Sequence, residues 1–215
     1  MISAAENVEG HRGIIVVMTD VTTAGLLVGP DGMPRCSWAG SAPEYLAYHD
    51  DEWGVPVHGE TALFERFTLE AFQSGLSWIT ILRKRPAFRA AFAGFDAEQV
   101  ATFDDTDRAR LMADAGIVRN ARKVDAAIAN ARAVLDLRDD GGLDAYVWSF
   151  APEHHQPPRS TADFRATSPE SVALAKGLKQ RGFVFVGPTT AYAAMQACGL
   201  VDDHVAGCFR AAAAT

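Results

Sequence analysis

Apolar residues recur every three or four positions through most of the chain after residue 34, which is the spacing of a helix with one buried face. Residues 119–137 show this pattern most clearly, with an apolar face at Ala121, Val124, Ile128, Ala131 and Leu135. Residues 61–73 predict a second helix of this kind. Further helices are predicted at 78–85, 86–95, 104–116, 168–182, 187–199 and 202–208.

Small residues and prolines mark the boundaries between these helices. Gly75 is expected to end one helix and Ser77 to begin the next, and Pro86 is expected to interrupt that second helix. Gly182 stands where a helix should end. Only residues 183–187, FVFVG, have an extended pattern. The sequence therefore predicts an all-α fold of eight or nine short helices.

The first 34 residues differ from the rest. They mix glycine, threonine and β-branched residues without helical periodicity, and they end in the turn-forming sequence GPDGMP. We expect residues 1–34 to be a flexible N-terminal extension, partly strand-like, and residues 35–215 to form one domain. Residues 1–32 are expected to be weakly packed and dispensable, with Met33 as an alternative start.

Composition narrows the class of protein. The chain has 215 residues, 48% of them hydrophobic, and no apolar run near the roughly 18 residues of a membrane helix, so a cytoplasmic protein without a membrane partner is expected. Three widely spaced cysteines argue against a disulfide framework. The formal net charge of −7 weakly disfavours a nucleic-acid partner, yet basic residues are concentrated at 83–89, 119–123 and 176–181.

One of these basic runs follows a tight turn between two predicted helices. Residues 114–120, DAGIVRN, contain the turn glycine Gly116. Backbone N–H groups at the start of the second helix suit a phosphate, and Arg119, Arg122 and Lys123 lie beside them. The alternative is an ordinary helix–helix connection.

Cysteines and histidines at the two ends of the predicted domain form a candidate metal set. His204 and Cys208 are four apart, which on a helix places both side chains on one face. Cys36 and His49 are separated by twelve residues, as in many zinc half-sites. Together they make a Cys₂His₂ set with no open position, which is typical of structural zinc. The alternative is two inert thiols and two surface histidines. Cys198 lies on an apolar helix end, where core packing is expected.

An acid on an apolar helix face forms the second chemical candidate. Glu70 lies on the stripe of Leu63 and Phe67, where a carboxylate is costly unless it is paired or functional. Aromatic residues are dense nearby, at Trp38, Tyr45, Tyr48, Trp53 and Trp78. Such a set suits a flat, cationic ligand that donates hydrogen bonds, since the rings stack on it and the carboxylate neutralises it.

Five stretches of the chain, in order, resemble the 3-methyladenine DNA glycosylase I family of the helix-hairpin-helix DNA glycosylases. They are RCSWAGSAPEYLAYHDDEWGVP, LEAFQSGLSWITILRKR, DAGIVRNARKVDAAIANARA, YVWSF and GFVFVGPTTAYAAMQACGLVDDHVAGC, and they run from Arg35 to Cys208. The resemblance implies a base excision repair enzyme that hydrolyses the N-glycosidic bond of 3-methyladenine in alkylated double-stranded DNA. An abasic site remains, and no lyase activity is expected. We expect the protein to be a monomer.

The resemblance also implies roles for individual residues. Glu70 accepts hydrogen bonds from the flipped base, in a pocket lined by Tyr45, Tyr48, Trp53 and Trp78. By analogy with apolar wedges in DNA-binding proteins generally, and not from the resemblance, Leu76 is expected to fill the gap in the duplex. The hairpin grips the DNA backbone through Gly116, Arg119, Arg122 and Lys123. One structural zinc ion per chain binds Cys36, His49, His204 and Cys208, and joins the N- and C-terminal segments.

The sequence departs from the wider superfamily in two ways. The region past the hairpin reads AYVWSF, without the catalytic aspartate that most members carry there, and the hairpin has the single glycine Gly116. Asp125 and Asp136 match no motif. Two other functions stay open: a zinc-dependent hydrolase, and a non-catalytic helix-hairpin-helix DNA-binding protein.

Overall fold

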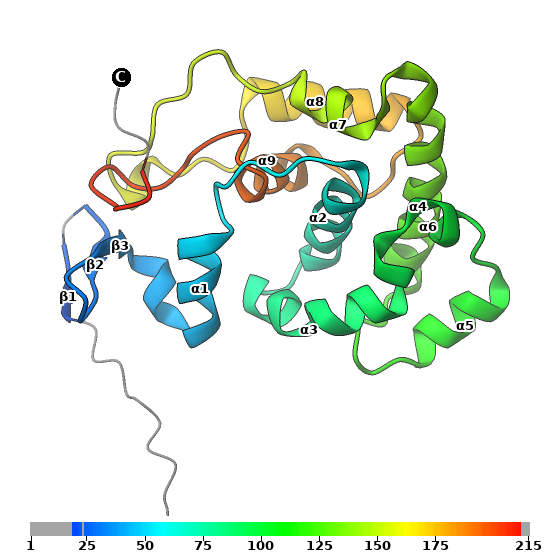
Figure 1. Ribbon diagram of the computed structural model, residues 1–215, viewed down its shortest axis with the longest axis horizontal. Helices are drawn as coiled ribbons and strands as arrows, with labels where there is room; N and C mark the ends of the chain where they lie inside the picture. The colour runs from blue at the N-terminus through cyan, green and yellow to red at the C-terminus, as the bar shows by residue number, and fades with distance from the viewer. Residues whose placement is uncertain (1–18, 23, 212–215) are drawn as a thin grey trace, which may run out of the picture.

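The computed structural model describes residues 19–22 and 24–211. In this part of the chain there are nine α-helices, four short 3₁₀ helices and one small sheet (Figure 1). The helices are α1 (Pro43–Asp51), α2 (Glu60–Gln73), α3 (Trp78–Ala91), α4 (Ala97–Ala101), α5 (Asp105–Ala113), α6 (Ala121–Leu137), α7 (Gly142–Trp148), α8 (Pro169–Gln180) and α9 (Pro188–Ala197). The fold is therefore mostly helical, as the periodicity predicts. None of these helices is both long and apolar enough to cross a membrane.

Helix α2 lies at the centre of the core and packs against α3, α6, α7 and α9. Its apolar face is fully buried at Leu63, Phe64 and Phe67. In Figure 1, α4, α5 and α6 lie on one side of α2, and α1 and the sheet lie on the other. Helix α2 thus carries Glu70 between the two halves of the molecule.

Two local predictions about α3 and the C-terminal segment are wrong. Pro86 does not interrupt α3, which continues through it. The proline lacks only the N–H that would bond the Leu82 carbonyl, and burial of Ile81 and Phe88 on either side holds the helix together. Residues 202–208 form no helix. Two of their backbone N–H groups bind other parts of the chain instead of a helix carbonyl: Ala206 donates to the Pro158 carbonyl at 2.8 Å and Val205 donates to Cys36 Sγ at 3.3 Å.

The predicted strand at 183–187 is also absent. Phe185 has a positive φ of 61°, which no strand tolerates. The side chain of Asn130 binds both backbone groups of Val184, donating to its oxygen at 3.1 Å and accepting from its nitrogen at 2.8 Å. A buried side chain of α6 therefore satisfies the groups that a neighbouring strand would have paired.

The described part of the N-terminal extension forms an antiparallel sheet of β1 (Thr19–Val21), β2 (Leu26–Val28) and β3 (Pro34–Cys36). The strand-like character is confirmed. Leu27 of β2 is buried opposite Arg35 of β3, and whether residues 1–32 are dispensable stays a prediction. The expected boundary after residue 34 therefore falls inside β3. Residues 1–18 lie outside the described part of the chain.

The sheet brings the two ends of the described chain together. The Phe209 N–H donates to the Pro34 carbonyl at 2.8 Å, and the Val205 N–H donates to Cys36 Sγ at 3.3 Å. In Figure 1 the C-terminal segment lies directly above β3. This contact places the C-terminal cysteine and histidine next to their N-terminal counterparts.

Candidate functional site

A cavity of about 370 Å³ opens between α1, α2, α3 and α9. All of the predicted pocket residues line it, and the lining comes from four separate stretches of the chain. Its lining is Trp38, Ser41, Tyr45, Tyr48, Trp53, Glu70, Gln73, Trp78, Ala193 and Gln196. The structure therefore brings together Glu70 and all four aromatic residues predicted to surround it.

Glu70 lies on the buried side of α2, with 6% of its surface exposed, and accepts no hydrogen bond from the described residues. Burial raises the pKa of Glu70 to about 8, although the Arg66 guanidinium one turn earlier draws that pKa down. At neutral pH the pocket alone thus favours the neutral acid. A cation inside the pocket would favour the carboxylate instead.

Arg66 forms its ion pair with Glu52, so Glu70 has no ion-pair partner among the described residues. Its Nη2 donates to Glu52 at 2.9 Å, and Arg85 donates to the same carboxylate at 2.5 and 2.8 Å. Burial opposes ionisation of Glu52, but the hydrogen bonds from Arg85 and Arg66 hold its pKa at about 2. Two guanidinium groups thus share one carboxylate, and Arg66 Nη1 is buried without a hydrogen-bond partner among the described residues. The carboxyl group of Glu70 makes no ion pair in the described part of the chain and remains available to a ligand.

The aromatic walls of the cavity are held by one another. Tyr48 and Trp78 have ring centroids 5.4 Å apart. Trp38 lies edge-on to Tyr45 and Trp53, at 5.7 and 5.1 Å. Such edge contacts fix the rings while leaving faces and edges for a planar ligand. The lining has the shape and chemistry that a flat base needs.

Five lining residues were not among the expected site residues: Trp38, Ser41, Gln73, Ala193 and Gln196. Trp38 belongs to the dense aromatic stretch, and that density was the available signal. Gln73 follows Glu70 by three positions and shares its helix face, so helical spacing could have found it. Gln196 comes from α9, far away in the sequence, and no local pattern marks it.

Leu76 and the hairpin stand on the surface, but not every predicted DNA contact does. Leu76 is 41% exposed in the turn between α2 and α3, beside two residues that line the cavity. Arg119 and Arg122 are exposed at the start of α6. The Gly116 N–H donates to Asp114 Oδ1 at 2.7 Å, so the expected phosphate donor at that position is already occupied.

Lys123 is not a DNA contact in this structure, which corrects the prediction. It is buried, and its Nζ donates to the carbonyls of Phe72 and Ser74 at 2.9 and 2.6 Å. These carbonyls lie at the C-terminal end of α2. A cation there donates hydrogen bonds to carbonyls that have no partner within the helix, and it interacts favourably with the helix dipole. Desolvation lowers the pKa of Lys123. The residue therefore ties α6 to α2 just behind Leu76.

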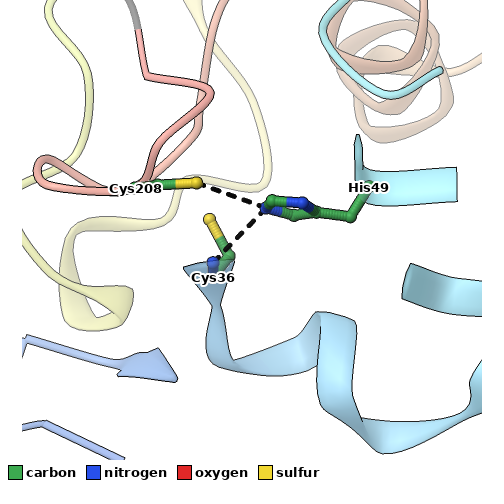
Figure 2. A group of neighbouring side chains, drawn as sticks. All are labelled: Cys36, His49 and Cys208. Carbon is green, nitrogen blue, oxygen red and sulfur yellow. Dashed lines mark hydrogen bonds between the residues drawn. The ribbon is translucent and has the colours of Figure 1, made fainter. Parts of the chain in front are cut away.

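Cys36, His49 and Cys208 form a buried cluster (Figure 2). Their ligand atoms all lie within 4.8 Å of one another. His49 Nε2 is 3.4 Å from Cys208 Sγ, and its Nδ1 is 2.7 Å from Asp50. The hydrogen bond between the two thiols lowers the pKa of Cys208, and the same hydrogen bond together with burial raises the pKa of Cys36.

His204 stands beside this cluster rather than within it. Its ring centroid is 4.8 Å from that of His49, and its Nδ1 is 2.7 Å from Asp202 Oδ1. Its Nε2 is buried and has no hydrogen-bond partner among residues 19–22 and 24–211. Gly54 allows this position, since a Cβ there would lie 2.8 Å from the His204 ring. Three of the four predicted ligands thus gather, with the fourth next to them.

A larger hollow of about 870 Å³ lies on the other side of α9, against the loop of residues 152–165. Its one deeply buried acid, Asp203, is fully hydrogen-bonded, to Tyr192, Gln196 and His155. Because no buried group there lacks a partner, the aromatic cavity around Glu70 is the candidate active site.

Known proteins match almost all of the described chain. The methyladenine glycosylase family matches residues 38–211. DNA-3-methyladenine glycosylase 1 of Escherichia coli K12 is 49% identical over 181 residues, which cover 82% of this chain and 96% of that protein. A crystal structure of 3-methyladenine DNA glycosylase I has a TM-score of 0.79 at 46% identity, and covers 83% of this chain and 100% of its own. A variant of such an enzyme in complex with 3-methyladenine has a TM-score of 0.79 at 33% identity, and the match covers 84% of this chain and 99% of that one. This chain, with its buried acid in an aromatic pocket, belongs to the methyladenine glycosylase family.

Proposed function

We propose that this protein hydrolyses the N-glycosidic bond of 3-methyladenine in alkylated double-stranded DNA, releasing the free base and leaving an abasic site. The observation that carries the proposal is Glu70, a buried acid in a pocket of aromatic rings that has no hydrogen-bond or ion-pair partner in the described part of the chain. Relatives of this chain are named for that reaction. We also propose that the protein acts in the cytoplasm as a monomer.

The pocket chemistry fits a cationic, planar base. Methylation at N3 gives the base a positive charge and weakens its glycosidic bond, so strong protonation of the leaving group is not needed. A flipped base would stack against the rings of Tyr48 and Trp78. Its charge would favour the ionised form of Glu70, and charge-assisted hydrogen bonds to that carboxylate would hold it.

The DNA contacts would surround the mouth of this pocket. Leu76 is exposed next to the cavity, where an apolar side chain can fill the space left by the flipped nucleotide. Arg119 and Arg122 are the exposed cations of the hairpin and would contact phosphates. Lys123 would act only indirectly, by holding the end of α2 from which Leu76 projects.

We propose further that the Cys/His cluster holds one structural zinc ion. Two thiols and two imidazoles are the ligand set that zinc prefers, and the buried, unpartnered Nε2 of His204 fits a missing ligand contact. Asp50 and Asp202 hold the Nδ1 atoms, so the Nε2 atoms of both histidines point to the cluster. His49 Nε2 lies 3.3 Å from the Cys36 backbone nitrogen and 3.4 Å from Cys208 Sγ, and a bound ion would replace these contacts. When bound, the ion would supply a cross-link between β3 and the C-terminal segment.

One assay separates this proposal from a zinc hydrolase and from a non-catalytic DNA-binding protein. Methylated DNA is incubated with the protein, with and without a chelator, and released bases are separated by chromatography. Release of 3-methyladenine that persists while zinc is slowly lost supports the proposal. Release that stops at once on metal removal, before any unfolding, favours the hydrolase. DNA binding without any base release favours the binding protein.

A further inference from the structure

Gln196 reaches the base pocket from α9, and its side chain is held from behind by a buried acid. Its Nε2 donates to Asp203 Oδ2 at 2.6 Å. Asp203 is 4% exposed and cannot swing away, because the Tyr192 hydroxyl donates to the same oxygen at 2.7 Å and His155 Nε2 lies 2.8 Å from the other. The Gln196 amide is therefore held by Asp203, whose own position is held by Tyr192 and His155.

The partner determines which end of the amide faces the ligand. An ionised carboxylate only accepts hydrogen bonds, so the NH₂ end of Gln196 must face Asp203. The Tyr192 hydroxyl and the Gln196 amide both donate to Oδ2 of Asp203, so this oxygen acts only as an acceptor. The amide oxygen makes no hydrogen bond with the described residues, and Gln196 lines the cavity. That oxygen is the end left for a bound base.

We propose that Asp203 orients Gln196 so that its amide oxygen joins the Glu70 carboxylate as a second acceptor in the pocket, and that this pair selects bases with an exocyclic amino group over bases with a carbonyl in its place. This inference rests on the proposed glycosylase function. Gln196 contacts the base, and Asp203 is a positioning residue.

The chemistry of the two purines supports the selection. Adenine carries an N6 amino group, a donor of two hydrogen bonds, where guanine carries the O6 acceptor. Two acceptors that converge on this position satisfy the amino group, whereas a carbonyl there meets two lone-pair-bearing oxygens and no donor. Sites built to bind a donor reject analogues that lack it, because buried polar groups are then left unpaired. The pocket should therefore prefer 3-methyladenine to 3-methylguanine.

The first test replaces Gln196 in the full-length protein. Gln196→Met keeps the length of the side chain and removes the acceptor. Release of 3-methyladenine and 3-methylguanine from the same methylated DNA is measured for wild type and variant. We expect the ratio of the two rates to fall by about 10-fold or more, the effect of one hydrogen bond to a charged partner. An unchanged ratio overturns the inference.

The second test separates positioning from simple structural support. In Asp203→Asn the new amide can donate to the Gln196 oxygen, so the glutamine can turn its NH₂ end toward the pocket. The ratio should then shift toward 3-methylguanine. Glu65→Gln removes the charge of another buried acid, which is paired with Arg89 and does not line the cavity, and it should leave the ratio unchanged. Equal changes in both variants would show that Asp203 only stabilises the fold.

The outcome for the wild-type protein distinguishes the two levels of the argument. Wild type that releases neither base contradicts the proposed function itself. If the wild type releases 3-methyladenine and the variants keep the wild-type ratio of the two released bases, only the role of Gln196 and Asp203 is contradicted. Binding of the two free bases, followed by fluorescence of the tryptophans that line the pocket, provides a readout independent of bond cleavage.

Discussion

Substitution of Glu70 by glutamine separates the cost of burying this acid from its use in the reaction. Because burial raises the pKa of Glu70 to about 8, the folded protein keeps a proton that the unfolded chain has released above its ordinary pKa of 4.5. A raised folded-state pKa stabilises the fold below 4.5, and this contribution is lost as the pH rises to about 8. Wild-type stability should therefore fall across that window because of this group.

The size of the effect follows from the pKa. Each pKa unit corresponds to about 1.4 kcal/mol, so full ionisation of Glu70 costs the folded state about 4 to 5 kcal/mol relative to the solvated acid. This value is an upper limit, since the pocket is open to water. Glu70→Gln does not titrate. The variant should thus gain stability relative to wild type as the pH rises from 5 to 9, by up to about 4 kcal/mol.

Urea unfolding of both proteins at several pH values measures this difference, and all other titrating groups cancel in the comparison. The same variant should lose excision of 3-methyladenine by about 10-fold to 100-fold, since a charged acceptor is gone. Glu65→Gln is the matched control. Glu65 is also buried on α2, but it is paired with Arg89 and does not line the cavity.

Two results would refute this reasoning. A stability difference between wild type and Glu70→Gln that stays constant from pH 5 to 9 would mean that Glu70 is not held neutral by burial. Full activity of the variant would leave lesion recognition to the aromatic rings alone. In either case the control should keep its activity, which shows that a neutral amide on α2 is tolerated.

Other predictions concern the metal, the hairpin and the sheet. Cys208→Ala should lower the melting temperature and remove one zinc per chain, and elemental analysis that finds no metal in the purified wild type would contradict this. Arg119→Ala and Arg122→Ala should each reduce the slope of log affinity for DNA against log salt concentration by about one unit. Lys123→Met should leave this slope unchanged. It should lower the free energy of unfolding by about 1 to 3 kcal/mol, because two carbonyls at the end of α2 lose their donor. A chain that starts at Met33 loses β1 and β2, so it should melt at a lower temperature than the full chain while keeping excision per folded molecule; equal melting temperatures would show that the sheet does not stabilise the core.

The helices themselves could be read from the sequence. The apolar repeat of residues 119–137 became α6 with Asn120 as its cap, and the stripe through Leu63 and Phe67 became the buried face of α2. Periodicity is a local signal, because side chains three and four apart must share a face whatever covers that face. For the same reason Glu70 could be identified from the sequence as an acid on a buried helix face. The density of aromatic residues near it indicated a pocket.

The partners of these residues were decided only by the tertiary structure. Lys123 looks like Arg119 and Arg122 in the sequence, yet it turns inward because the end of α2 lies within its reach. Cys208 and Cys36 meet because residues 202–208, for which the sequence predicts a helix, form an irregular segment that binds the sheet edge. Asp203 and Gln196 form a pair whose purpose neither residue reveals alone. A sequence pattern shows which side of a helix or strand is buried. The direction in which a charged or hydrogen-bonding side chain points depends on the groups that packing brings near it. Those groups come from residues far apart in the chain, so the sequence pattern does not show them.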